Sequence, residues 1–163
     1  MDPFADFVTH PGAFGYASPK ALALNDVDGD GLVDLVTGQG NGGAASLAFY
    51  KNQGTNQAPV WRKSPGCVSN FNCPVGTTSQ NPLANVMSAT ISNSDGEPVF
   101  VQLYNDRWDL VIMGNSLTYA TRGTGSPVAY TTQTGASNPF NSISSSNNLY
   151  VCFGDLDGDG DNE

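Results

Sequence analysis

Basic residues are scarce in this chain of 163 residues. Only six side chains are Lys or Arg, against fifteen Asp or Glu, so the formal net charge is -9. The six basic residues are scattered along the chain and do not gather into a cluster. The sequence therefore offers no basic face for a nucleic-acid backbone or an anionic membrane. The acidic excess instead indicates that a cation is the natural partner.

Long apolar runs and helix-forming stretches are also missing. No window approaches the roughly 18 apolar residues that span a bilayer, so no membrane span is expected. The first residues, MDPFADF, lack the basic and apolar regions of a signal peptide. Charged residues make up 13% of the chain, which contains 19 Gly and 10 Pro, a composition typical of short strands joined by turns. With 39% hydrophobic residues to form a core, we expect an all-β globular protein.

Catalytic combinations of residues are absent from the sequence. The single histidine, His10, lies in a stretch rich in Pro and Gly with no nucleophile nearby in sequence. The stretch GQGNGG at 38–43 has the glycine spacing of a dinucleotide-binding loop, but the residues after it are broken too soon by Asn-Gln-Gly to form the required helix. We predict a hairpin at 38–43 and no enzymatic activity.

Three cysteines leave one without a partner. Cys67 and Cys73 lie close together in a turn-rich stretch and are predicted to close a small disulfide loop. Two free thiols are the alternative, whereas a zinc site is less favoured because no second Cys or His pair would complete it. Cys152 lies in the strand-like stretch LYVCFGD and is predicted to be a lone buried thiol.

Weak internal repeats divide the chain into three units. An Asx-Pro-apolar motif occurs at 2–7, 81–86 and 138–143, and strands beginning at an aspartate occur at Asp34 and Asp109. A proline-led strand also recurs, in APVWRKS and SPVAYTTQ. We therefore predict a first repeat at 1–80 with a cysteine-containing insertion near 63–80, a degenerate second repeat at 81–137, and the truncated start of a third at 138–163.

Each of the first two units carries four short strand signals bounded by turn residues. They lie at 20–25, 34–38, 46–52 and 59–64 in the first unit, and at 98–104, 108–114, 117–123 and 127–133 in the second. A further strand is expected in NNLYVCFGD at 147–155. Four antiparallel strands in about 55 to 65 residues match one β-propeller blade. Because a closed propeller needs at least about four blades, we expect about two and a half tandem blades that stay open within this chain.

The stretch DVDGDGLVD places oxygen donors at alternate positions. The predicted ligands are the carboxylates of Asp26, Asp28, Asp30 and Asp34 and the carbonyl of Leu32. Glycines between the aspartates permit the backbone to curl, so that these five oxygens can meet around Ca²⁺. Thr37 stands where an EF-hand has its bidentate Glu, and a strand rather than a helix follows. The spacing therefore predicts a calcium loop that is not an EF-hand.

The same pattern returns near residue 160 but fails in the second unit. In the third unit the five predicted ligands are Asp155, Asp157, Asp159, the carbonyl of Asp161, and Glu163. In the second unit the aligned residues are Val101, Leu103, Asn105, Arg107 and Asp109. We therefore predict metal in the first and third units only.

The pattern D-x-D-x-D-G-x-x-D-L from Asp26 to Leu35, with the later FYKNQGTNQAPVW, resembles the FG-GAP or VCBS repeat family. The likeness is strong over 19–61 and 147–163 and faint over 98–140. Repeats of this family form calcium-loop blades in integrin α-chain propellers and in many secreted bacterial and algal proteins. The resemblance implies propeller-type blades, Ca²⁺ as the cofactor, and an extracellular or cell-surface location.

Two classes of function follow from these features. The first is a non-catalytic, extracellular, calcium-stabilised structural or adhesive module, such as a subunit of a surface fibre. Its partners would be other copies of itself, joined head to tail, or further repeats of the same polypeptide. The second is a glycan-binding propeller in which Trp61, Trp108 or Tyr150 stacks on sugars, although strand positions favour the core for all three. An accessory propeller of a larger secreted enzyme is a further alternative.

Overall fold

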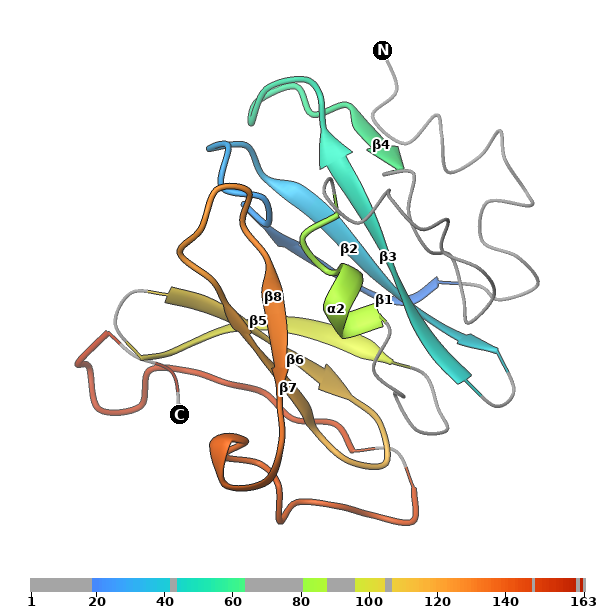
Figure 1. Ribbon diagram of the computed structural model, residues 1–163, viewed down its shortest axis with the longest axis vertical. Helices are drawn as coiled ribbons and strands as arrows, with labels where there is room; N and C mark the ends of the chain where they lie inside the picture. Colours follow the sequence, from blue (N-terminus) through green and yellow to red (C-terminus); the bar gives the residue numbers. More distant parts are fainter. Residues whose placement is uncertain are drawn as a thin grey trace.

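The computed structural model describes residues 19–41, 44–63, 81–87, 96–104, 107–147, 149–160 and 162. Within these ranges the chain folds into two four-stranded antiparallel sheets with almost no helix (Figure 1). The all-β prediction is therefore confirmed. No helix in the described ranges is long and apolar enough to cross a membrane.

The first sheet is a simple meander in which every strand pairs with its sequence neighbour. Its strands are β1 (Pro19–Asn25), β2 (Asp34–Asn41), β3 (Ala44–Asn52) and β4 (Trp61–Lys63). β2 and β3 form the predicted hairpin, because Asn41 lies opposite Ala44 in the ladder.

The second sheet repeats this arrangement. Its strands are β5 (Glu97–Tyr104), β6 (Arg107–Met113), β7 (Thr118–Arg122) and β8 (Tyr130–Gln133). All eight predicted strands of the first two units are confirmed. The registers also correspond, since Leu35 of β2 lies opposite Tyr50 and Leu110 of β6 lies opposite Ala120. Leu35 and Leu110 are therefore equivalent positions in the two sheets.

A shared apolar core joins the two sheets face to face. Its buried residues are Val36, Leu47 and Phe49 of the first sheet, Leu110, Ile112, Ala120 and Tyr130 of the second, and Val27, Leu83 and Val86. Leu83 and Val86 lie at the short helix α2 (Ala84–Met87), beside β8 (Figure 1). A Cβ on Gly38 would overlap the carbonyl oxygen of Gly96, so a glycine is required where β2 approaches β5.

The chain after β8 covers the other face of the second sheet. Phe140, Leu149, Val151 and Phe153 pack there against a cluster made by Val101, Val111, Leu117 and Tyr119. This third layer follows the short 3-10 turn η2 (Gly135–Ser137). The described residues thus form three successive layers: the first sheet, the second sheet and this covering segment.

The covering segment differs from its prediction. Residues 149–155 are not a strand, because no other described strand pairs with them, although Leu149 donates its N–H to the Gly114 carbonyl at 2.8 Å. Alternate side chains face the second sheet, which leaves Tyr150 and Cys152 exposed. The predicted burial of Cys152 is therefore wrong.

The Asx-Pro motif has the same geometry wherever it is described. Asn81 Oδ1 accepts the N–H of Leu83 at 3.0 Å, and Asn138 Oδ1 accepts the N–H of Phe140 at 2.9 Å. The two apolar residues then enter successive cores, Leu83 between the sheets and Phe140 beneath the third layer. The motif therefore plays the same part in two consecutive layers.

Candidate metal-binding loops

The loop between β1 and β2 curls around the carboxylate of Asp26. Asp26 Oδ1 accepts the N–H of Gly29 at 2.8 Å, and its Oδ2 accepts the N–H of Gly31 at 3.0 Å. Both glycines have positive φ, +83° and +86°, a backbone conformation that other residues rarely adopt. The glycines at these positions therefore let the loop close on its first aspartate.

Three of the predicted ligands converge. Asp26, Asp28 and Asp34 each offer a carboxylate oxygen, and these oxygens lie within 4.8 Å of one another. Calcium binds oxygen at about 2.3 to 2.6 Å, so ligands on opposite sides of the ion lie about 5 Å apart. The three oxygens therefore fit on one coordination sphere. Leu32, predicted as a carbonyl ligand, donates its N–H to Asp30 Oδ1 at 2.9 Å.

Asp30 is not one of these three residues, and a lysine bridges its carboxylate to that of Asp28. The Lys51 ammonium, from β3, bonds the carboxylate of Asp28 and lies 2.8 Å from Asp30 Oδ2. Burial alone would lower the pKa of Lys51, but the bonds to the two aspartates raise it above its usual value. Sequence reasoning missed this cation, which reaches the loop from a strand 23 positions along the chain.

Asp34 is the most enclosed of the converging residues. Its carboxylate is fully buried and accepts the N–H groups of Asn52 at 2.8 Å and Val27 at 3.1 Å. Burial raises the pKa of Asp34 to about 6, against the lowering effect of the Asn52 bond and with a further increase from the charge of Asp28. A buried carboxylate beside a second carboxylate is costly to ionise, so a cation at this point would stabilise the loop.

The loop that follows the covering segment repeats these bonds. Asp155 Oδ1 accepts the N–H of Gly158 at 2.6 Å and its Oδ2 accepts that of Gly160 at 3.0 Å, and both glycines again have positive φ. Asp155, Asp157 and Asp159 bring carboxylate oxygens within 4.8 Å of one another, and all three are exposed. The other predicted ligands, Asp161 and Glu163, lie outside the described residues.

An arginine stands beside the equivalent aspartate of the second sheet. Asp109 is fully buried and accepts the N–H of Arg122 at 2.8 Å, as Asp34 accepts that of Asn52. Arg107 donates to both oxygens of Asp109, at 2.7 and 2.8 Å, and the Tyr119 hydroxyl donates at 2.5 Å. The guanidinium therefore supplies the positive charge here. Of the other positions aligned with the ligands, Asn105 lies outside the described residues.

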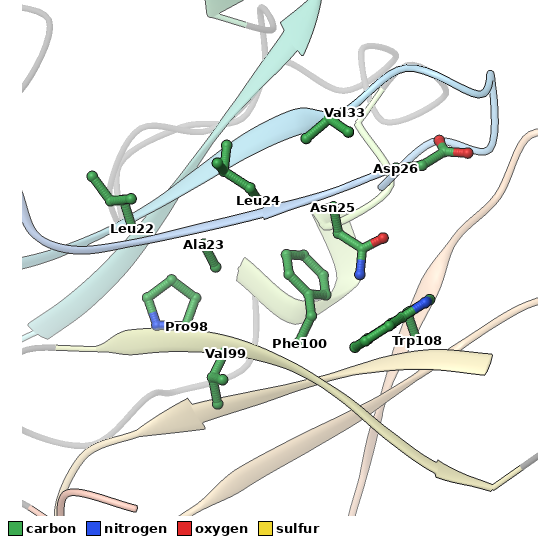
Figure 2. Close-up of a pocket in the computed structure, with 10 residues that line it drawn as sticks. All are labelled: Leu22, Ala23, Leu24, Asn25, Asp26, Val33, Pro98, Val99, Phe100 and Trp108. Atoms are coloured by element: carbon green, nitrogen blue, oxygen red, sulfur yellow. The ribbon is translucent and has the colours of Figure 1, made fainter. Parts of the chain in front are cut away.

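A groove of about 520 Å³ runs between β1 and β5 beside the first loop (Figure 2). Its lining is mainly apolar, with Asn25 and Asp26 at the end where Trp108 lies. Trp108 is 40% exposed and Tyr150 is 70% exposed, so the expectation of a core position is wrong for both. It is confirmed for Trp61, which is buried and donates its indole N–H to the Val33 carbonyl.

The predicted disulfide between Cys67 and Cys73 lies outside the described residues.

Comparison of the chain with family models, with curated proteins and with solved structures found no match. Any account of function therefore depends on the two acidic loops, the groove and the layered fold.

Proposed function

We propose that this protein is a non-catalytic, extracellular, calcium-stabilised structural or adhesive module. The observation that carries the proposal is the correspondence of the two acidic loops. In each, the first aspartate accepts the same two glycine N–H groups, and three carboxylates gather within 4.8 Å. Two separate segments that each curl around their first aspartate and gather three carboxylates indicate a repeated binding function, with Asp34 as the third member in the first loop and Asp159 in the later one.

Calcium suits these loops better than the other common cations. Every candidate ligand is a hard oxygen, with no Cys or His among the grouped residues, which disfavours zinc. Magnesium requires near-ideal octahedral geometry, whereas calcium accepts the irregular oxygen sets that short loops provide. Sites outside the cell bind calcium weakly and are filled by the high calcium concentration there. This is the reason for placing the protein at the cell surface or in a secreted assembly.

The tandem organisation is part of the same proposal. Face-to-face packing of two meander sheets, followed by a third layer, is the arrangement expected of consecutive propeller-type blades. Successive use of Asn81 and Asn138 in consecutive layers supports units at 1–80, 81–137 and 138–163. The resemblance to FG-GAP and VCBS repeats fits this scheme and is part of the proposal.

Calorimetric titration and thermal unfolding test calcium binding directly. We expect two sites per chain and a melting temperature that falls in chelator, since a hundredfold excess of ligand over Kd adds about 2.7 kcal/mol of stability. Asp28→Ala should abolish one site and Asp157→Ala the other. Asn105→Ala, at an aligned position of the second unit, is the matched control and should keep both. A melting curve that chelator leaves unchanged would contradict the proposal.

Glycan binding is a second candidate, and the groove is its specific support. Trp108 presents an exposed aromatic side chain in the same groove as Asn25 and Asp26, a combination that can stack on a sugar ring and bond its hydroxyls. A glycan array should then show binding that is lost in Trp108→Ala and kept in Tyr150→Ala, an exposed aromatic that does not line the groove. Absence of any array signal from the wild-type protein would remove this candidate.

A further inference from the structure

The turn between β3 and β4 holds the back of the first acidic loop. Asn56, in this turn, accepts the N–H of Val33 with its side-chain Oδ1 at 2.7 Å and donates from its Nδ2 to the Gly31 carbonyl at 3.1 Å. The carbonyl of Val33 accepts the Asn52 amide and the Trp61 indole N–H, both at 3.1 Å. The stretch Gly31–Val33 is therefore fixed by side chains from another part of the first sheet.

These bonds determine the direction of the Leu32 carbonyl. Both peptide groups of Leu32 are trans, so within each the C=O and the N–H point in opposite directions. The Val33 N–H points to Asn56, so the Leu32 carbonyl, which shares its peptide group, points away from Asn56. The Gly31 carbonyl also points to Asn56, so the Leu32 N–H points away, and this N–H bonds Asp30 Oδ1 at 2.9 Å. The Leu32 carbonyl is thus turned to the side of the loop where the aspartates lie.

The Leu32 carbonyl is also available for a ligand. Within the described residues no donor bonds it, whereas the carbonyls of Gly31 and Val33 each accept a side-chain N–H. Leu32 is the seventh position of the loop counted from Asp26, the position from which a calcium loop contributes a backbone carbonyl. A carbonyl oxygen that faces carboxylates without a hydrogen bond can complete their coordination of a cation.

The first loop already holds a cation that comes from outside its own residues. The Lys51 ammonium, carried by β3, bonds Asp28 and lies 2.8 Å from Asp30 Oδ2. This ion pair does not depend on the curl of the loop backbone, and it places a positive charge between two of the loop carboxylates. The aspartates toward which the Leu32 carbonyl turns therefore form a surface that binds a cation in the structure itself.

We propose that Asn56 is a positioning residue of the first loop, whose amide turns the Leu32 carbonyl toward the three converging carboxylates so that it becomes a fourth oxygen ligand of calcium. Asn56 acts through Leu32 and does not itself bind the metal. Groups that orient a ligand in advance raise the affinity of a metal site. The inference rests on the proposed calcium function, to which it adds a residue that no ligand pattern includes.

The second sheet supports this assignment because it lacks both the loop and the amide. Only residues 105 and 106 separate β5 from β6, so no acidic loop occupies this place. The turn after β7, GTGSPVA at 123–129, contains no Asn, whereas the turn after β3, QGTNQAPV at 53–60, contains Asn56. Of the two sheets, only the one with an acidic loop therefore carries the amide that would position it.

The later acidic loop holds the matching N–H in a different way. Asn162 follows Asp155 by seven positions, as Val33 follows Asp26, and its N–H donates to the Gln102 carbonyl of β5 at 2.7 Å. A group outside the loop thus fixes the eighth position in both loops. Substitution of Asn56 should therefore affect the first loop and leave calcium affinity at the later loop unchanged.

Europium luminescence of the intact chain tests the role of Asn56. Eu³⁺ replaces calcium in oxygen sites, and its luminescence lifetimes in H₂O and D₂O give the number of water molecules bound to the ion. The Asp157→Ala variant, in which the later loop is expected to lose its metal, isolates the first loop. Adding Asn56→Ala should raise the count there by one water, which takes the place of the Leu32 carbonyl, and should weaken calcium binding about tenfold in calorimetry.

A neighbouring substitution in the same turn is the matched control. Gln57→Ala should change neither the water count nor the calcium affinity, and both residues are exposed, so neither substitution removes core packing. A merely structural role of Asn56 would weaken binding without adding a water, so weaker affinity at an unchanged water count would overturn the proposal. Unchanged affinity and water count would overturn it as well. Failure of the Asp157→Ala parent to bind either Eu³⁺ or calcium would instead refute the proposed calcium function, and the role of Asn56 with it.

Discussion

Asp34 and Asp109 occupy the same position in the two sheets. Each is fully buried, and each accepts a backbone N–H at 2.8 Å, from Asn52 in the first sheet and from Arg122 in the second. In both sheets the donor lies two residues after the ladder partner of the leucine that follows the aspartate. The sheets differ in how this charge is balanced. Asp34 belongs to a group of carboxylates that can hold a metal, whereas Asp109 is bonded by Arg107.

Arg107→Met should destabilise the protein by about 3 kcal/mol, because removing one partner leaves the buried Asp109 carboxylate without a compensating charge. The loss should be the same in calcium and in chelator, since an arginine and not a metal provides the charge. Urea denaturation in both conditions measures it. A loss that calcium reverses would show that the second sheet also binds metal.

Lys51→Met should tighten calcium binding at the first loop. The ammonium bonds Asp28, one of the three converging carboxylates, so calcium must compete with it. A partly exposed ion pair of this kind contributes up to about 1 kcal/mol, which corresponds to roughly fivefold in affinity. The same change should lower the stability of the calcium-free protein by a similar amount. In titration calorimetry the affinity of the loop at Asp155–Asp159 should stay constant, and a weaker first site would contradict this account.

Local sequence patterns predicted the strands, whereas ion pairs and the exposure of single side chains depend on tertiary contacts. All eight strands of the two sheets, and the curl at Gly29 and Gly31, follow from period-two alternation and turn residues that act within a few positions. The ion pairs of Lys51 depend on a strand far along the chain, so no local pattern reveals them. The exposure of Cys152 could not be predicted either, because it depends on which side of an extended segment has a neighbouring layer.

Buried tyrosines should make the protein sensitive to alkali. Burial raises the pKa of Tyr50 from its ordinary value of 10.0 to about 12, and burial likewise raises the pKa values of Tyr119 and Tyr130. The unfolded chain ionises first, so the stabilising contribution is complete below pH 10 and is lost as the pH rises toward 12. Tyr50→Phe should therefore lose less stability than wild type between pH 9 and pH 11 in urea denaturation. Equal slopes for wild type and Tyr50→Phe would refute the assignment.

Alanine at two equivalent glycines should separate loop strain from packing between the sheets. Gly29 and Gly158 hold the same place in their loops, with φ of +83° and +84°. A Cβ at Gly158 would meet nothing within 4 Å, whereas a Cβ at Gly29 would lie 2.9 Å from Val128 Cγ2 and 3.2 Å from Arg122 Nη2. Both substitutions should cost about 1 to 2 kcal/mol for the left-handed backbone conformation. Gly29→Ala should cost at least about 1 kcal/mol more, because a side chain must be forced into a packed contact.

The additional loss of stability in Gly29→Ala would measure how strongly the packing of the first loop on the second sheet resists a change in the loop. Arg122 already reaches across this contact to the Asp26 carbonyl, with its Nη2 at 3.3 Å, so the loop and the second sheet share a polar bond as well as the Val128 contact. Movement of Gly29 should therefore disturb Asp26 and weaken calcium binding at the first loop. Gly158→Ala should leave that site unchanged. Urea denaturation and calorimetric titration of the two variants give both quantities. Equal losses of stability would mean that the loop does not depend on the second sheet.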